Sequence, residues 1–290
     1  MKIFQRFIQN LLNIHFLLFL NGFLIAGFLF CSFQADYENR LFASIAKSIS
    51  VSEGQVSQDS ILKKAVSTTY SLLVDRSKIF YSVKTGGFLD NVIHPLSTDM
   101  MTAEGACGSY AAVLCRILNS LGYTTRFGQM SVDGIYGGHI VAEAKTMNGW
   151  VVLDPIYNLC FAKPDGYLAS FKDVAANWQW YKKQVPATYN LHYNYNAVRY
   201  TNWNKIPVVM PAIKETLSLF MREDEVQQMS FRNYFLNKYA VCSNFLLLLI
   251  FPLSIYIVTK MTNYKFSFKI RFRNFPHSFS NGHPGHTNAL

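Results

Sequence analysis

The sequence predicts an α+β domain held between two membrane-spanning helices. Two long apolar runs without charged residues lie near the ends of the chain, at residues 10–33 and 239–259. Between them, apolar side chains recur at helical spacing over residues 107–121, and three strand-like runs follow at 123–130, 139–147 and 150–153. A helix that leads into antiparallel strands is typical of the α+β class.

The first apolar run, residues 10–33, is long enough to be a membrane anchor. At about 1.5 Å per residue, a helix of this length crosses a hydrocarbon core of about 30 Å. A cleaved signal peptide is the alternative, with Lys2 and Arg6 as its basic start. The run exceeds the usual apolar core of such a peptide, and no clear small-residue cleavage site follows it. We therefore predict an uncleaved transmembrane helix.

The second apolar run, residues 239–259, lies between Lys238 and Lys260. Its length again suits one crossing of a bilayer. Pro252 predicts a kink, because proline lacks a backbone N–H and crowds the preceding turn.

The basic residues favour one orientation of these two helices. The chain has a net charge of +10, and the segments outside the two runs contain no Asp or Glu. These segments hold seven basic residues: Lys2, Arg6, Lys260, Lys265, Lys269, Arg271 and Arg273. Positive flanks predict cytoplasmic placement for residues 1–9 and for the basic tail at 260–290. The domain at 36–235 is then periplasmic or extracellular, in a protein of the plasma (inner) membrane.

The same distribution argues against a nucleic-acid partner. Only a small excess of positive charge remains between the two runs, with 20 basic and 17 acidic residues. No basic stripe is left in the folded region, so the tail is predicted to meet lipid headgroups of the bilayer.

The cysteines do not form a recognisable disulfide framework. There are five, an odd number, and Cys31 and Cys242 fall in or beside the apolar runs. Cys107, Cys115 and Cys160 lie in the central domain, and whether Cys115 pairs with Cys160 stays open at this point.

Residues 36–75 are predicted to be mostly helical. Apolar side chains such as Leu41, Ile45 and Ile49 recur there at helical spacing. A polar stretch at residues 50–60 predicts a loop that divides the region into two helices.

Cys107 is a candidate nucleophile because of its place at the start of the predicted helix, in the sequence EGACGSY. Free N–H groups and a partial positive charge at a helix N-terminus favour the thiolate, and they also stabilise an oxyanion. Small residues on both sides leave room for a substrate carbonyl. Cys115 lies two turns later within the apolar pattern, which predicts an inert core residue.

His139 and Asp154 are placed to complete such a site. His139 follows Gly137-Gly138 at the start of a strand, and Asp154 ends the next strand before Pro155. A base beside the nucleophile, oriented by a third group, is the general arrangement of an activated cysteine. Taken singly, a buried cysteine, a hydrogen-bonded histidine and an Asp-Pro turn are ordinary structural features.

Together these segments resemble the transglutaminase-like superfamily. The resemblance lies in GACGSYAAVLCRILNSLGYTTRFGQM, then GGHIVAEA, then NGWVVLDP, and covers roughly residues 80–160. It implies a papain/transglutaminase-like core, in which the nucleophile helix packs on an antiparallel sheet. It also implies a catalytic triad of Cys107 as nucleophile, His139 as base and Asp154 as orienting carboxylate.

Two details depart from the family pattern. Many members follow the histidine with Ala-Trp, whereas Ile140-Val141 stand here, so the usual aromatic wall is missing from that place. The side chain that donates to the oxyanion is also not evident, with Gln129 and Tyr110 as candidates.

The position of Asp154 depends on the strand register. A two-residue turn centred on Asn148-Gly149 sets Asp154 opposite Glu143, four residues from His139 and too far for a hydrogen bond. A wider connection over residues 145–148 sets Asp154 opposite His139. The triad therefore predicts the wider connection, a tight hairpin would argue against the role of Asp154, and Glu143 is then the alternative partner of His139.

The region after Asp154 is rich in aromatic residues, at 160–205. Two interpretations are open: a stacking surface for sugar or peptide, or packing beneath the sheet and along the membrane interface. Apolar spacing in residues 206–220 predicts a short amphipathic helix that returns towards the bilayer.

The resemblance implies an enzyme that forms a thioester acyl-enzyme and then acts as hydrolase or acyltransferase. Its substrate in the envelope is a peptide, protein or glycopeptide. No cofactor is expected, and no metal, because Cys107, His139 and Cys160 lack a zinc-site spacing.

Two other functions share parts of this pattern. A catalytically inactive envelope scaffold or binding protein with the same fold uses its aromatic surface for partners. An arylamine acetyltransferase has the same chain order of Cys, His and Asp, but acetyl-CoA chemistry suits the cytosol, and this domain is predicted to face away from it.

Overall fold

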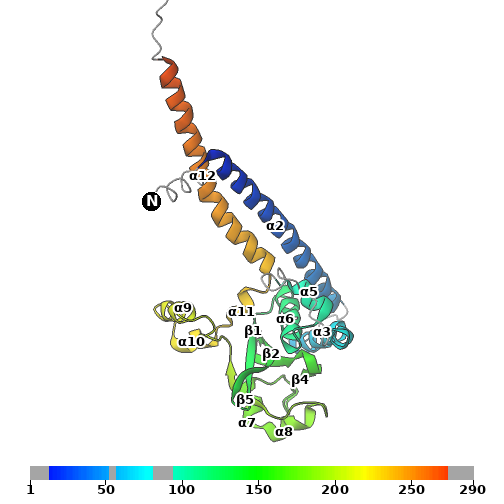
Figure 1. Ribbon diagram of the computed structural model, residues 1–290. Coiled ribbons are helices and arrows are strands. Elements are labelled where there is room, and N and C mark those ends of the chain that lie inside the picture. Colours follow the sequence, from blue (N-terminus) through cyan, green and yellow to red (C-terminus); the bar gives the residue numbers. More distant parts are fainter. Residues whose placement is uncertain (1–12, 52–56, 81–93, 274–290) are drawn as a thin grey trace, which may run out of the picture. The chain divides into compact units, whose positions relative to one another are not determined.

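The structure is a computed structural model, and it describes residues 13–51, 57–80 and 94–273 (Figure 1). The predicted cytoplasmic segment at 1–9 and the end of the basic tail at 274–290 lie outside the described residues. The chain forms two compact units, Met1–Phe30 with Ser243–Leu290, and Cys31–Cys242.

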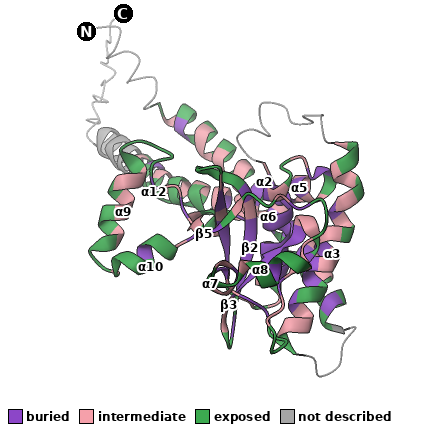
Figure 2. Cartoon of the chain, turned by 90° about the horizontal axis from the view of Figure 1, so that it is seen from below, coloured by how far each residue is buried: buried purple, intermediate pink, exposed green. Residues whose placement is uncertain are grey.

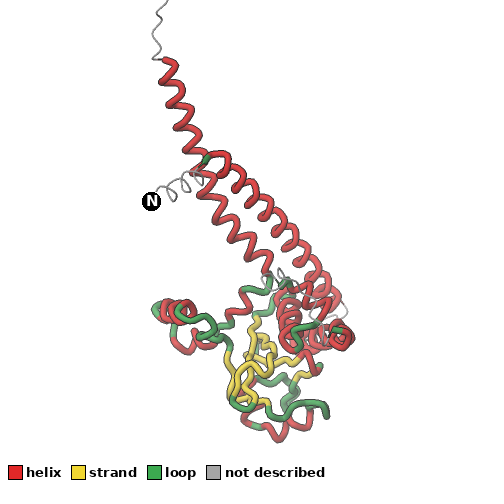
Figure 3. Tube along the Cα trace, in the orientation of Figure 1, coloured by secondary structure: helices red, strands yellow, loops and turns green. Residues whose placement is uncertain are grey.

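The first unit contains the apolar parts of two long helices, α2 (Ile14–Val51) and α12 (Lys238–Arg273) (Figure 3). Both are long and apolar enough to cross a membrane. A Cβ atom on Gly27 would lie 3.5 Å from Leu246, and Ser254 Oγ donates to Asn21 Oδ1 at 3.2 Å. Most of their large apolar side chains are exposed, as lipid-facing helices require.

The two helices are longer than the apolar runs that predict them. The helix predicted within 36–75 begins as a direct continuation of the first apolar helix, because α2 runs unbroken to Val51. Its last turns carry Phe42 and Ile49 into the core of the second unit. Pro252 lies inside α12, and the kink expected from it stays a prediction.

The second unit is built on a five-stranded antiparallel sheet in the order β4-β3-β2-β1-β5. Its strands are β1 (Thr125–Val132), β2 (Ile135–Thr146), β3 (Gly149–Asp154), β4 (Leu159–Cys160) and β5 (Tyr193–Arg199). The predicted α+β class is confirmed.

Helices cover both faces of this sheet, so that the central strands are buried (Figure 2). One core contains α3 (Gln58–Ile79), α5 (Leu96–Thr102) and α6 (Cys107–Ser120), which pack with Ala142 and Ala144 of β2. Strand alternation turns Val141 to the other face, where it packs with α7 (Phe171–Ala176) and α8 (Trp178–Tyr181).

The remaining described elements are short. They are η1 (Pro155–Tyr157), η2 (Lys182–Gln184), α9 (Val209–Ser218), α10 (Glu223–Gln228) and α11 (Phe231–Tyr234).

The connection between β2 and β3 corrects one prediction. Thr146 pairs with Gly149, so the turn consists of the two residues Met147 and Asn148, and the predicted wider connection is wrong. The turn also begins one residue earlier than the centre at Asn148-Gly149 that we considered. Continuing the observed pairing of Ala142 with Leu153 sets Asp154 beside Val141, two residues from His139.

Candidate active site

Cys107 begins α6 after an unusual turn. Ala106, the residue before it, has φ 45° and ψ −127°, and Ala103 has φ 52°. A non-glycine residue held in such a conformation costs on the order of 1–3 kcal/mol and persists only where its surroundings enforce it. As the first residue of a 14-residue helix, Cys107 lies where the helix dipole favours a negative charge.

His139 and Asp154 form a buried hydrogen-bonded pair. His139 Nε2 lies 2.7 Å from Asp154 Oδ2, and the two side chains are only 2% and 1% exposed. Diagonal neighbours on adjacent strands are within reach of each other, so the tight β2–β3 turn is compatible with this bond. The structure thus brings Asp154 to His139 by a register that we did not predict.

The thiol of Cys107 interacts with this pair through His139. Burial alone would raise the pKa of Cys107, but the hydrogen bond and charge of His139, with the N–H of Ile140, outweigh it and lower that pKa. Burial alone would likewise lower the pKa of His139, but Asp154 and then Cys107 raise it to about 9. Both shifts favour a thiolate–imidazolium pair.

The other central cysteines differ from Cys107. Cys115 is fully buried in α6, and burial raises its pKa to about 12. Cys160 is a free thiol, as is Cys115, so the pairing that the sequence left open does not occur. The two cysteines of α6 therefore differ, because the pKa of Cys107 is lowered and that of Cys115 is raised.

An aromatic wall stands against His139, although not where the family pattern places it. Tyr193 of β5 stacks on the imidazole, with ring centroids 4.2 Å apart and planes 7° from parallel. Tyr157 meets the same ring edge-on at 5.9 Å. The sequence prediction assigned neither residue to His139: Tyr193 belongs to the aromatic region at 160–205, and Tyr157 lies just before it.

Most of the aromatic residues downstream pack beneath the sheet. Tyr181, Tyr189 and Tyr195 are buried in the second core with Phe161 and Phe171. These side chains therefore pack in the core and do not form a stacking surface for substrate. Trp180 is an exception, with 42% of its surface exposed.

Two of the other three predicted candidates, Tyr110 and Glu143, have partners other than the Cys107–His139–Asp154 group. The hydroxyl of Tyr110 lies 3.1 Å from Ser77 Oγ, on the side of α3, and Tyr110 is buried there. Glu143, the alternative partner of His139, instead accepts a hydrogen bond from Arg126 Nε at 2.6 Å. Gln129 pairs with Ile140 across the sheet, and its Oε1 accepts from Arg199. Gln129 stays a prediction as oxyanion donor.

A second group of polar residues holds the turn before Cys107. The Ser109 hydroxyl donates to Asp99 Oδ1 and accepts from the Gly105 N–H at 2.9 Å. His94 Nε2 lies 3.1 Å from the same Asp99 oxygen. These bonds connect the first turn of α6 to α5, and no sequence pattern predicts them.

We predict that Ser109→Ala raises the midpoint pH of Cys107 alkylation and destabilises the unit by about 1–3 kcal/mol, because it leaves the buried Asp99 carboxylate without this donor. The turn then no longer holds Cys107 against His139. Alkylation rate against pH and exposure of Cys115 on heating measure the two effects. Ser120→Ala is the control, since that hydroxyl bonds only within its exposed helix turn. Equal midpoints in the two variants would refute this role.

Among the described residues, no group of three or more His, Cys, Asp or Glu side chains is arranged to hold a metal ion. Comparison of the chain with known protein families, with curated proteins and with solved structures gives no match.

Proposed function

We propose that this protein is a membrane-anchored cysteine enzyme of the transglutaminase-like kind, which transfers an acyl group through a thioester. One observation carries the proposal: a buried histidine–carboxylate pair adjoins a cysteine whose pKa is lowered at a helix N-terminus. A nucleophile, a base and a group that orients the base are the three components of this chemistry.

In the proposed reaction the Cys107 thiolate attacks a carboxamide or peptide carbonyl carbon and forms a C–S bond. Asp154 binds Nε2 of His139, which leaves Nδ1 to act at the sulfur. The imidazolium gives its Nδ1 proton to the departing nitrogen as the C–N bond breaks. His139 then takes a proton from water or from an amine, which attacks the thioester and releases Cys107.

Asp154 has an electrostatic and an orienting role in this scheme. Its carboxylate raises the pKa of His139 to about 9, which keeps the imidazole protonated when the leaving group needs a proton. Stacking by Tyr193 keeps the ring in the plane that Asp154 requires. Together they hold the tautomer and the orientation of the base.

The proposed location is the outer side of the plasma membrane. The basic residues that flank the two apolar helices favour cytoplasmic termini and a periplasmic or extracellular domain. A peptide, protein or glycopeptide of the envelope is then the substrate.

A substrate screen on the full-length protein in phosphatidylcholine nanodiscs tests the activity. Glutamine peptides and cross-linked envelope peptides serve as acyl donors, with and without an added primary amine. Release of ammonia or peptide without amine means hydrolysis, and incorporation of the amine means transfer. Cys107→Ala must abolish either activity, and Cys115→Ala must preserve it. Retained activity in Cys107→Ala would contradict the proposal.

A catalytically inactive scaffold is the second candidate. The observation that favours it is the burial of His139 and Asp154, which exposes almost none of either side chain to solvent. An inactive scaffold has no need of a reactive thiol, so a Cys107 that labels no faster than Cys115 would support this function.

The pKa shifts predict the pH dependence of the thiol. Iodoacetamide should alkylate Cys107 with a midpoint below the value of about 8.5 that is usual for a free cysteine. Turnover should fall again as the pH rises through about 9, because His139 then loses the proton that it donates. The raised pKa of His139 stabilises the folded state at low pH, and this contribution is lost over the same rise. A midpoint at or above the usual value would contradict the assignment.

A further inference from the structure

Residues 206–220 expose an unusual number of large apolar side chains. Val208, Leu219 and Phe220 are 81%, 79% and 83% exposed, and Ile206 and Val209 are about half exposed. Soluble surfaces rarely gather apolar side chains in this density, and such a group marks a contact with a partner or a membrane.

The helix at the centre of this segment, α9, turns Met210, Ile213 and Leu217 towards the rest of the unit, where they are half-buried. Lys214 and Leu219 are among the residues that line a cavity of about 610 Å³ together with Trp203. None of the residues of α9 is buried. The strongly exposed apolar side chains therefore lie at the two ends of α9, outside the core, where they are available for an outer contact.

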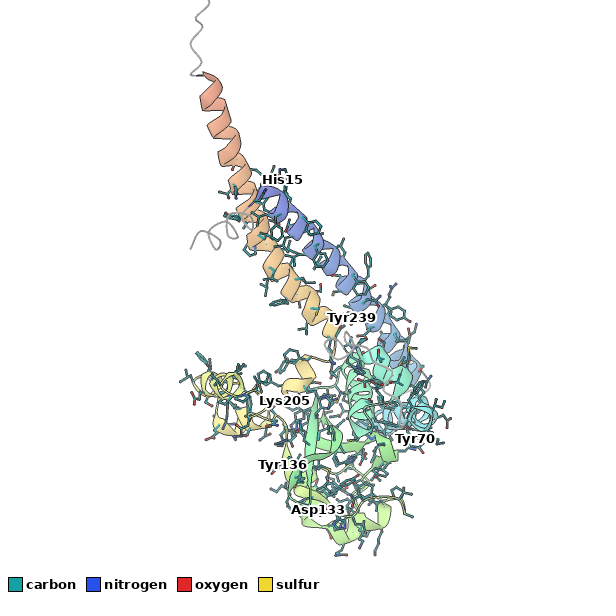
Figure 4. The ribbon with its side chains drawn as sticks, in the orientation of Figure 1. His15, Tyr70, Asp133, Tyr136, Lys205 and Tyr239 are labelled. Carbon is teal, nitrogen blue, oxygen red and sulfur yellow. The ribbon has the colours of Figure 1, made fainter. Side chains whose placement is uncertain are left out.

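The segment lies at the end of the unit where α12 begins. In Figure 1, α9 and α10 are at the same end as α11, which leads into α12, whereas α7 and α8 are at the opposite end. Figure 4 shows the same order, with Lys205 on the side of Tyr239 and Asp133 at the far end. Only 17 residues separate Phe220 from Lys238, where the second apolar helix starts.

The charges of the segment favour apolar insertion over attraction to anionic headgroups. Residues 206–220 contain one basic side chain, Lys214, and one acidic side chain, Glu215. Lys214 also lies 3.6 Å from Glu223 of α10. Helices that bind membranes through charge carry several basic residues on the polar face, and this one does not.

We propose that residues 206–220 dock on the bilayer, with Val208, Leu219 and Phe220 inserted into the lipid interface beside the start of α12. The inference rests on the membrane anchoring in the proposed function and is independent of the chemistry at Cys107. Docking at this third point holds the domain, with its active site, at the membrane surface.

Photo-crosslinking in phosphatidylcholine nanodiscs tests the docking. The full-length chain carries p-benzoylphenylalanine in place of Phe220, of Ile135 or of Phe251. Ile135 is the matched control, because it is an apolar residue of 72% exposure at the β1–β2 turn. Phe251 of α12 reports on the span itself. We expect lipid adducts from positions 220 and 251, with at least tenfold less from position 135.

The outcomes separate the proposals. Adducts from 251 without adducts from 220 overturn the docking and leave the anchor intact, whereas loss of both overturns the anchor as well. A cross-link from 220 to a second copy of the chain assigns the surface to self-association and overturns lipid docking. Repeating the reaction with one-fifth phosphatidylglycerol should leave the yield from 220 unchanged, and a several-fold rise would overturn apolar insertion.

Discussion

His139→Ala is expected to lower kcat/KM by about 10²- to 10⁴-fold and to raise the pH at which Cys107 becomes reactive. The hydrogen bond and charge of the imidazole lower the pKa of Cys107, and in the proposed reaction the imidazole also supplies the proton for the leaving group. Without it, burial is left as the dominant influence on the thiol and opposes the thiolate. Alkylation rates from pH 5 to 10, followed by mass spectrometry of the labelled peptide, measure the shift.

A surface pair in the same protein is the matched control. His192 Nδ1 lies 3.1 Å from Asp133 Oδ1, and both side chains are largely exposed. His192→Ala removes an exposed histidine–aspartate pair and leaves Cys107, His139, Asp154 and the neighbouring Tyr193 unchanged, so the reactivity of Cys107 should stay as in the unmodified protein. An equal loss in both variants would mean that general destabilisation, and not the base, explains the effect.

Asp154 is expected to act mainly through His139, because the direct effect of its charge, which raises the pKa of Cys107, is smaller than the effects of His139 on that thiol. Asp154→Asn keeps a hydrogen-bonding side chain but removes the charge that raises the pKa of His139. The alkylation midpoint should therefore move up in Asp154→Asn, by less than in His139→Ala. A variant that folds and keeps the original midpoint would remove Asp154 from the triad.

The sequence was sufficient to predict that Cys107, His139 and Asp154 lie together, but not which residues surround them. Cys107, His139 and Asp154 each stand beside a local signal, namely a helix start, a glycine pair and a proline. Tyr193 is 54 positions from His139 and has no such signal, so only the pairing of β5 with β1 reveals the contact. The same holds for Asp99 and Ser109, which meet because α5 packs on α6.

The register of β2 and β3 shows that an error of one residue in the position of a turn changes which residues are expected to meet at the site. Moving a two-residue turn by one position changes each cross-strand partner by two residues. The turn that we considered placed Asp154 opposite Glu143, whereas the observed turn places it beside Val141 and within 2.7 Å of His139. Sequence propensity does not resolve one residue in the position of a turn, because Met147-Asn148 and Asn148-Gly149 both permit it.

Glu143→Ala is expected to produce the largest loss of stability, about 3–5 kcal/mol, because it leaves Nε of the buried, charged guanidinium of Arg126 without its hydrogen-bond acceptor. The side chains of Arg126 and Glu143 are only 10% and 1% exposed. The guanidinium lies 4.0 Å from the ring centres of both Trp150 and Tyr200, so it cannot turn to solvent without leaving these rings. For a unit of this size the loss lowers Tm by about 6–20 °C.

Glu143→Gln should cost far less than Glu143→Ala. Burial raises the pKa of Glu143 even though Arg126 opposes this shift, which means that desolvation of the carboxylate exceeds the attraction of its partner. A neutral amide avoids that desolvation and still accepts a hydrogen bond from Arg126. The free energy of unfolding is therefore expected to be highest in the unmodified protein, slightly lower in Glu143→Gln and lowest in Glu143→Ala.

Labelling of Cys115 is a measurement that reports on this unit alone. The thiol is fully buried, so a thiol reagent reaches it only when the domain opens, whether or not the apolar helices stay folded. Glu225→Ala is the control, because its pair with Arg222 is exposed and contributes about 0–1 kcal/mol. If Glu143→Ala and Glu225→Ala exposed Cys115 at the same temperature, the buried pair would not be a determinant of stability. If Glu143→Gln were as unstable as Glu143→Ala, the charge of Glu143, rather than its hydrogen bond, would hold Arg126 in place.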